Sequence, residues 1–282
     1  MRNLTAFLSM LFVSILGYSQ IDNRNFEDLI ESKILVSNIN GNRYNIQVSL
    51  PKTYYDNDSK SYPVLYALDG MHSVPMLNSI RQYMEIGNYL EEFIIVGIQG
   101  NIPRNRLMQH RIPDYTPLRD TVYENRFSQI MGLKKGSVLS GKADEFLKVI
   151  SDQVIPYIDK NYRVDNRSGL LGHSLAGLFT AYTLINKPEL FNFYLISSPS
   201  LNWDDGNFVK RLKPDEINKS DISVFISVGG EEKELHNFIE LFQKKLEHSN
   251  FDTVYKVYDK ESHFSVVAGS FSNGILQFAG KK

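Results

Sequence analysis

The 282-residue chain has no cysteine and almost no excess charge. Without cysteine it can form no disulfide, use no thiolate nucleophile, hold no Cys-ligated metal and carry no lipid on an N-terminal cysteine. Because the formal net charge is only −1, no basic surface of the kind that binds nucleic acid is expected, and we expect no nucleic-acid partner. Hydrophobic residues make up 42% of the chain and charged residues 22%, a composition that indicates a globular protein and excludes wholesale disorder.

Motifs for metals and phosphates are also missing. The sequence has no His-x-x-x-His or His-Glu-x-x-His spacing, and no glycine-rich loop that ends in Lys-Ser or Lys-Thr. The neighbouring pair Asp204 and Asp205 is not a metal site by itself. We therefore expect no metal ion, no bound nucleotide and no other cofactor.

Long apolar runs are absent except near the N-terminus. Arg2 precedes an apolar run from Ala6 to Gly17, which is short for a permanent membrane span. Gly17 and Ser19 have the spacing of a cleavage site, so we interpret residues 1–19 as a secretory signal peptide. Residues 20–282 are then expected to form a single exported domain, periplasmic or secreted, with no stable membrane insertion. An uncleaved N-terminal anchor is the alternative.

Short continuous apolar runs recur along the rest of the chain. Continuous rather than alternating hydrophobicity is typical of strands covered on both faces, as in a parallel sheet between helices. Such runs span residues 64–68, 93–98, 193–196 and 224–228, residues 254–258 alternate more, and helical patterns lie at 143–162, 175–185 and 232–247.

Two strand-like runs near the start, Lys33 to Asn38 and Arg43 to Leu50, are joined through Asn40-Gly41, a strong hairpin signal. The sequence therefore predicts an α/β fold in one domain: a mostly parallel central sheet, an antiparallel N-terminal hairpin, and helices on both faces. Residues 101–141 show few periodic apolar positions, and we expect them to be irregular. Such a segment is either a solvated excursion or part of the wall of a substrate site.

One short stretch carries the chemistry. Residues 172–177 read Gly-x-Ser-x-Ala-Gly, between a short apolar run at Gly169 to Leu171 and a helical pattern. A strand, a tight turn and a helix force the middle residue into a strained backbone conformation that lifts its side chain above the sheet edge. We expect Ser174 to be an exposed nucleophile. The alternative is a glycine-bounded turn whose serine caps the helix.

A serine hydroxyl needs a base, normally a histidine that a carboxylate holds in the correct tautomer. His263 follows the last predicted strand, at the edge where catalytic groups of open α/β sheets gather, and we predict that it is the base. His173 adjoins the serine, but on a tight turn we expect it to point away and pack beneath the sheet edge. A helix-capping role is the alternative for His263.

The orienting acid should lie between the serine and the histidine in the chain. The run 224–228 ends in Gly229-Gly230, and we predict Glu232 as the acid, with Glu231 as second choice. The alternative is that these glutamates only favour the start of the next helix through its dipole. Lower-ranked candidates for the acid are Asp204, Asp205 and Asp259.

A tetrahedral intermediate also needs hydrogen-bond donors aimed at its oxyanion. The backbone N–H of Leu175, directly after the nucleophile, is the first candidate. The second is the N–H of Met71, in the loop after the strand that ends at Leu68. Neither donor uses its side chain, so residue identity hardly constrains this prediction.

From about Val36 to the C-terminus the chain resembles an esterase family of α/β hydrolases that includes esterase D-like enzymes, feruloyl esterases and siderophore esterases. The resemblance implies a Ser, acid, His mechanism, with the family's serine and histidine at Ser174 and His263. Ala176 stands where the commoner elbow has glycine. The motifs that carry the resemblance are Tyr62-Pro-Val-Leu-Tyr-Ala-Leu-Asp-Gly70, Ile95-Val-Gly-Ile98, Arg104-Asn-Arg106 with Asp114-Tyr-Thr-Pro117, Phe146 through Ile155-Pro-Tyr-Ile158 to Tyr162-Arg163, the elbow at 172–177, and Ser198-Pro-Ser-Leu-Asn-Trp203.

These observations predict an exported serine hydrolase that cleaves small-molecule carboxylic esters through an acyl-enzyme on Ser174. An aromatic or anionic substrate, such as a catecholate siderophore, would suit a pocket lined by Tyr115, Trp203 and the arginines of residues 104–119, with Arg104 and Arg106 as the first candidates. Two alternatives remain open. An acyltransferase would use the same three residues, and a catalytically silent binding protein would use only the scaffold.

Overall fold

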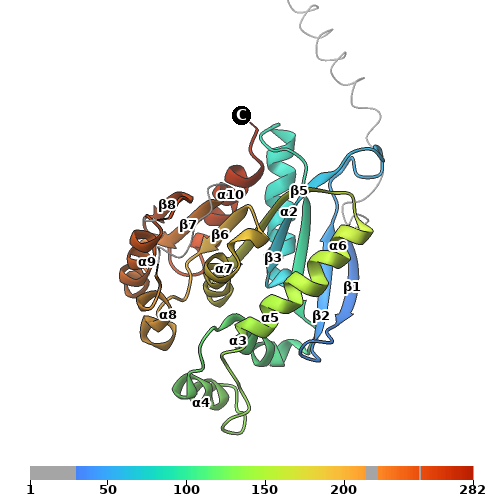
Figure 1. The fold of residues 1–282 in the computed structure, drawn as a ribbon. Helices are drawn as coiled ribbons and strands as arrows, with labels where there is room; N and C mark the ends of the chain where they lie inside the picture. The colour runs from blue at the N-terminus through green and yellow to red at the C-terminus, as the bar shows by residue number, and fades with distance from the viewer. Residues whose placement is uncertain (1–29, 214–221, 248, 282) are drawn as a thin grey trace, which may run out of the picture.

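The computed structural model describes residues 30–213, 222–247 and 249–281, so the predicted signal peptide, residues 1–19, lies outside the described residues. Within these residues eight strands form one sheet in the order β1-β2-β4-β3-β5-β6-β7-β8 (Figure 1). The strands are β1 (Ile30–Val36), β2 (Arg43–Ser49), β3 (Tyr62–Leu68), β4 (Ile94–Gly100), β5 (Val164–His173), β6 (Phe193–Ser197), β7 (Ser223–Gly229) and β8 (Asp252–Tyr258).

The pairing of the strands confirms the predicted fold class. β1 pairs antiparallel with β2, and this pair is the predicted N-terminal hairpin. β2 also pairs antiparallel with β4, which joins the hairpin to the main sheet. The other neighbouring strands, from β4 through β8, are parallel. Their carboxyl ends therefore meet at one edge, where loops can bring distant residues together.

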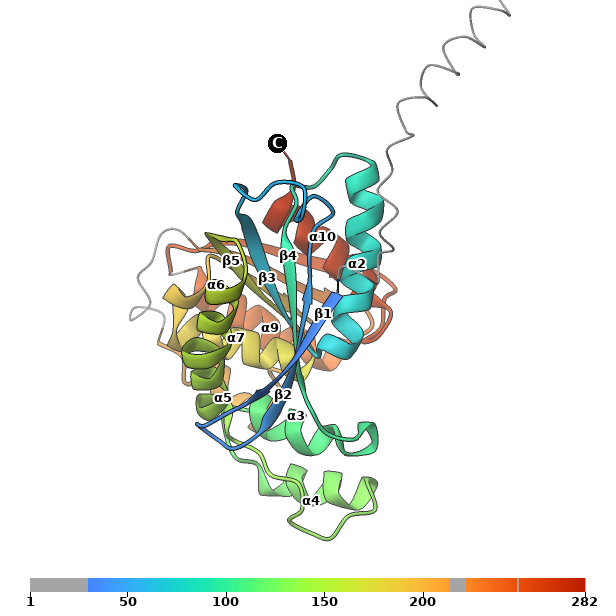
Figure 2. The same ribbon diagram turned by 90° about the vertical axis from the view of Figure 1, so that its right-hand side faces the viewer.

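Helices cover both faces of the sheet. Figure 2 shows α5, α6 and α7 on one side of the sheet and α2 and α10 on the other, with α3 and α4 together beyond one end. The helices are α2 (Gly70–Ile86), α3 (Met108–Tyr115), α4 (Thr121–Ile130), α5 (Ala143–Val149), α6 (Ile155–Asn161), α7 (Leu175–Asn186), α8 (Asn207–Lys210), α9 (Lys233–Leu246) and α10 (Val266–Ala279), with 3₁₀ turns at Arg104–Arg106 (η2), Pro188–Leu190 (η4) and Trp203–Gly206 (η5), and a π turn at Ile150–Val154 (η3) between α5 and α6.

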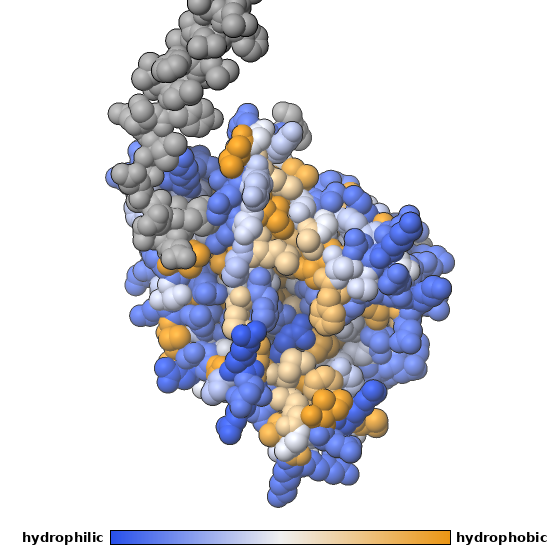
Figure 3. All heavy atoms as spheres, turned by 180° about the vertical axis from the view of Figure 1, so that it is seen from behind, coloured by the Kyte–Doolittle hydropathy of each residue, from blue (hydrophilic) through white to orange (hydrophobic). Residues whose placement is uncertain are grey.

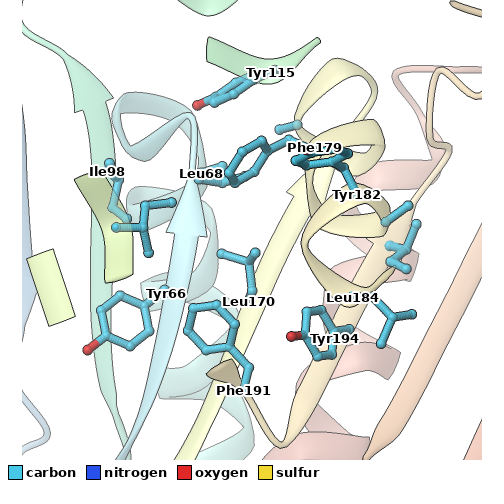
Figure 4. Packing of buried hydrophobic residues seen from close by; sticks show 14 of the residues in the cluster. Tyr66, Leu68, Ile98, Tyr115, Leu170, Phe179, Tyr182, Leu184, Phe191 and Tyr194 are labelled. Atoms are coloured by element: carbon cyan, nitrogen blue, oxygen red, sulfur yellow. The ribbon is translucent and has the colours of Figure 1, made fainter. Parts of the chain in front are cut away.

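Alternation along the central strands builds two separate cores. All seven residues of β3 are buried, as the continuous apolar run predicts. Leu65 and Ala67 belong to the core beneath α2 and α10, whereas Tyr66 belongs to the larger core on the opposite face. In that larger core the Tyr66 ring lies 5.5 Å from the ring of Phe191 (Figure 4). Successive strand residues point to opposite faces, so a strand with a helix layer on each side must be apolar throughout.

The sequence interpretation was wrong about residues 101–141, which contain η2, α3 and α4 rather than irregular chain. The periodic signal is weak because α3 has only eight residues and its buried ones, Ile112 to Tyr115, cluster in its last turn. α4 begins with a cap in which Asp120 accepts a hydrogen bond from the Tyr123 N–H at 2.9 Å. α2 and α10 were not among the predicted helices either.

Two features are absent from the part of the chain that the structure describes. None of the helices there is long and apolar enough to span a membrane. In the same residues no three or more His, Asp or Glu side chains are grouped so that they could hold a metal ion.

Figure 3 shows the back of the molecule, where apolar side chains gather in a band down the middle of the face between hydrophilic margins.

Candidate active site

The predicted elbow is present at the carboxyl end of β5. β5 ends at His173, α7 begins at Leu175, and Ser174 between them has φ 63° and ψ −122°, a conformation that L-residues rarely adopt. Gly172 is required at this turn, since a Cβ there would lie 2.2 Å from the carbonyl oxygen of Ala176. The chain therefore turns sharply enough to hold the Ser174 side chain at the sheet edge.

Three side chains from three loops form a hydrogen-bonded chain. His263 Nε2 lies 2.9 Å from Ser174 Oγ, and His263 Nδ1 lies 2.5 Å from Glu232 Oε1. An ionised carboxylate can only accept, so Nδ1 carries the proton and Nε2 is free to accept from the serine hydroxyl. The structure thus brings together the three residues that the sequence order selected.

The second oxygen of Glu232 is held separately. Ser198 Oγ donates to Glu232 Oε2 at 2.6 Å, and the Gly229 N–H donates to the same oxygen at 2.7 Å. Burial alone would raise the pKa of Glu232, but hydrogen bonds from His263, Ser198 and Gly229 outweigh it and hold this pKa below its ordinary value. Glu232 is therefore ionised and fixed in one orientation, whereas its neighbour Glu231 is exposed.

Both predicted oxyanion donors lie at helix starts. Leu175 is the first residue of α7 and Met71 the second residue of α2, positions where a backbone N–H has no acceptor within its own helix. Asp69, which precedes α2, has φ 54°, and a Cβ at Gly70 would lie 2.9 Å from the Gly97 backbone. The loop between β3 and α2 is thus pressed against β4 in a fixed conformation beside the elbow.

Two cavities meet at Ser174. The first, of about 580 Å³, is here called the apolar cavity because most of its wall is aliphatic, aromatic or methionine. Its wall includes Phe264, which directly follows His263 and is 82% exposed. The residues that line it are Asp69, His72, Ser73, Met76, Leu107, Met108, Arg111, Tyr123, Phe127, His173, Ser174, Leu175, Ser200, His263, Phe264, Val267 and Phe271.

The second cavity, of about 820 Å³, is here called the polar cavity because carboxylates and other polar side chains dominate its wall. It shares Tyr123, Ser174, Leu175, Ser200 and His263 with the apolar cavity. Its remaining lining residues are Asp120, Asn202, Trp203, Asp204, Asp205, Glu231, Glu232, Lys233, Glu234, Leu235 and Ser262.

The four residues predicted to line the substrate pocket do not lie together in the structure. Trp203 lines the polar cavity, where its Nε1 donates to the Leu118 carbonyl at 2.9 Å. Tyr115 is only 4% exposed and packs in the core instead, with its hydroxyl accepting from the Asp69 N–H at 3.2 Å. Arg104 and Arg106 are exposed on η2 and are not among the described residues that line either cavity.

Two further residues lie beside the nucleophile, Arg111 and His173. Arg111 of α3 lines the apolar cavity, and its Nε lies 2.9 Å from both carboxylate oxygens of Asp69. The interpretation of His173 was wrong: it lines the apolar cavity, with its ring 4.7 Å from the ring of His263. Burial, aided by His263 and Arg111, lowers the pKa of His173 to about 4. Of the arginines in residues 104–119 that the sequence analysis expected at the pocket, Arg111 is the one that lines a cavity among the described residues.

The sequence of this chain is similar to those of known esterases. Residues 37–272 match the family described as "Putative esterase". Ferri-bacillibactin esterase BesA of Bacillus subtilis is 29% identical over 153 residues, which are 49% of this chain and 52% of that protein. Apo-salmochelin esterase of Escherichia coli is 28% identical over 174 residues, 58% of this chain and 49% of that protein. The matches thus span about half the length of these two relatives.

A solved structure shows likeness along almost the whole chain. The BES protein from Bacillus cereus is 26% identical and superimposes with a TM-score of 0.74, over 92% of this chain and 98% of that one. The chain therefore belongs to this esterase family of α/β hydrolases, and is by that membership a carboxylic ester hydrolase.

Proposed function

We propose that this protein is a serine esterase that cleaves small-molecule carboxylic esters through an acyl-enzyme on Ser174. The observation that carries the proposal is the chain of hydrogen bonds from Ser174 Oγ through His263 to Glu232. This chain supplies a nucleophile, a base and an orienting acid within hydrogen-bond reach of one another.

Each residue then has one role. Ser174 Oγ attacks the ester carbonyl while His263 Nε2 takes its proton, and Glu232 stabilises the imidazolium that forms. The N–H groups of Leu175 and Met71 hold the oxyanion, and removal of one such donor typically costs about a hundred- to a thousand-fold in rate. His263 protonates the leaving alkoxide, and then removes a proton from the water that releases the acyl group. No cofactor enters these steps.

The names of two relatives guide the choice of substrate. Ferri-bacillibactin esterase and apo-salmochelin esterase are named for siderophores, and siderophore or aromatic acyl esters are accordingly the first classes to assay. An acyltransferase would use the same Ser174 acyl-enzyme with an alcohol in place of water. Product analysis with and without a sugar or lipid acceptor distinguishes the two.

Two measurements test the proposed nucleophile. A fluorophosphonate probe should label the wild-type protein on Ser174, as mass spectrometry of the labelled peptide would show. Ser174→Ala should abolish labelling and lower kcat by at least about 10⁴-fold. Ser79→Ala, an exposed serine on α2, is the matched control and should behave as wild type. Labelling at another residue, or turnover that survives Ser174→Ala, would contradict the proposal.

Export is a separate part of the proposal. We infer from the sequence that residues 1–19 direct the protein out of the cytoplasm and are then removed. N-terminal sequencing of the mature protein from its native compartment should begin at Gln20. An intact Met1 on the mature protein would contradict cleavage.

A further inference from the structure

The two cavities that meet at Ser174 differ in charge. In the apolar cavity the cationic side chain is Arg111, and Asp69 neutralises it through contacts of 2.9 Å from Nε and from Nη2. Arg111 Nη2 also donates to the His173 carbonyl at 3.3 Å. The guanidinium is therefore used to tie the loop after β3 to the elbow, which leaves the apolar cavity close to neutral.

The polar cavity carries a surplus of negative charge. Besides Glu232, its wall includes the carboxylates Asp120, Asp204, Asp205, Glu231 and Glu234, whereas Lys233 is the one lysine or arginine among the described residues that line it. Asp205 is paired with Lys210 at 2.7 Å, but both side chains are well exposed, so water screens that pair.

Two arginines that the sequence analysis expected at the site do not balance this charge. Arg104 and Arg106, expected from the sequence to recognise an anionic substrate, are on η2 and outside the described lining of both cavities. A cleft with charge of one sign focuses its field on whatever enters, and so favours ligands of opposite sign over ligands of the same sign.

Resting on the proposed function, we propose that this cleft selects its ester by charge. The ester has one apolar arm, which occupies the apolar cavity, and a second arm that is uncharged or cationic, which occupies the polar cavity. Esters with an anionic second arm are disfavoured at the same Ser174. A catecholate siderophore with deprotonated hydroxyls belongs to the disfavoured class, whereas an uncharged hydroxamate ester belongs to the favoured one.

A series of three benzoyl esters tests this selection. The alcohol arms are choline, its uncharged isostere 3,3-dimethylbutanol, and the anionic isethionate, so that the acyl arm stays constant. We expect kcat/KM to fall in that order, with about tenfold or more between cation and anion at low ionic strength. In about 0.5 M NaCl the spread should shrink, because screening weakens the field of the exposed carboxylates. In a second series the acyl arm carries the charge and the alcohol arm stays constant. This series tests esters that bind with their two arms exchanged between the cavities.

A pair of double variants identifies the source of the selection. Glu231→Gln with Glu234→Gln removes two charges from the polar cavity, and should narrow the cation-to-anion ratio by about threefold or more. Glu240→Gln with Glu247→Gln is the matched control: it removes the same charge from the same helix and its end, at exposed positions that line neither cavity. The control should leave the ratio as in wild type.

The outcomes separate this inference from the proposed function. A preference for the cation in either series, narrowed by the cavity variants alone, supports charge selection. Equal turnover of cation and anion in both series, a preference for the anion, or equal narrowing by the control overturns it while leaving Ser174 chemistry intact. If the uncharged ester itself is not hydrolysed, or is still hydrolysed by Ser174→Ala, the proposed function fails instead.

Discussion

The two edges of the parallel sheet differ in how much backbone strain they hold. At the carboxyl edge, six non-glycine residues with positive φ lie in the loops that follow β3, β5, β6 and β8. At the amino side a single one, Asn88, is found among the described residues, in the turn between α2 and β4. The six at the carboxyl edge are Asp69, Ser174, Ser198, Asp204, Asp205 and Lys260.

The amino edge instead holds paired charges in relaxed backbone. Lys60 contacts Glu92 at 2.5 Å, and Arg167 contacts Glu91 at 2.8 Å. A residue in a sparsely populated φ/ψ region costs about 1–3 kcal/mol, which the surrounding structure must offset. Of these six residues, Ser174 is the proposed nucleophile, Ser198 donates to Glu232, and Asp69 directly precedes the helix that carries a proposed oxyanion donor. Strain is therefore concentrated where side chains must be presented to a substrate.

The largest effect should come from removing the Glu232 carboxylate from the chain of hydrogen bonds that ends at Ser174. Glu232→Gln can present an amide N–H to His263 Nδ1 and so stabilise the tautomer that cannot accept the serine proton. We expect kcat to fall by about 10³- to 10⁴-fold with little change in KM, measured with an uncharged ester. Glu231→Gln, the rejected neighbour, should lose less than about fivefold. A loss below tenfold for Glu232→Gln would mean that Ser174 and His263 suffice without the acid.

Besides backbone strain, a buried carboxyl group in α3 lowers the stability of the folded protein. Asp114 is buried, and burial raises its pKa to about 7, although the Tyr44 hydroxyl, which donates to it at 3.0 Å, acts in the opposite direction. Because the folded-state pKa lies above the unfolded one, the folded protein binds more protons between pH 4 and 7, and stability falls as the pH rises through that range.

Asp114→Asn should remove this penalty while retaining an acceptor for Tyr44. We expect its free energy of unfolding at pH 8 to exceed that of wild type by up to about 4 kcal/mol, because the pKa of this carboxyl is about 7 in the folded protein and about 3.9 in the unfolded chain, with little difference at pH 4. Urea denaturation at both pH values measures this. Equal effects at pH 4 and pH 8 would show that ionisation of Asp114 is not the cause.

How much of the fold and of the site could be predicted from the sequence depends on whether the pattern is local or involves residues far apart in the chain. The run Val64 to Leu68 and the elbow around Ser174 are local patterns, and each predicted its element correctly. The order serine, glutamate, histidine selected three residues that the structure brings together. Two residues of α3 were expected at the pocket, Tyr115 and Arg111, and only Arg111 lines a cavity. The sequence does not show which side of a short helix faces the nucleophile, and so it could not separate the two.

A smaller effect is expected from Ser198, which holds Glu232 without touching the nucleophile. Ser198→Ala removes one donor from Glu232 Oε2, so the pKa of Glu232 should rise and its orientation should loosen. We expect kcat to fall about tenfold and the acid limb of the pH–rate profile to move to higher pH, with KM unchanged. Ser227→Ala is a matched buried control, because Ser227 Oγ pairs with Ser270 Oγ at 2.6 Å. An unmoved acid limb in Ser198→Ala would contradict this role.

The smallest effect tests the strain itself. Ser174→Gly should raise the free energy of unfolding by about 1 kcal/mol over Ser174→Ala, because glycine tolerates φ 63° and ψ −122° whereas alanine does not. Both variants lose the hydroxyl, so their difference isolates the backbone. Asn88→Gly, compared with wild type, should change stability by less than about 0.5 kcal/mol, since asparagine already tolerates left-handed φ and glycine costs entropy in the unfolded chain. If glycine stabilised position 88 as much as position 174, strain would not distinguish the two edges.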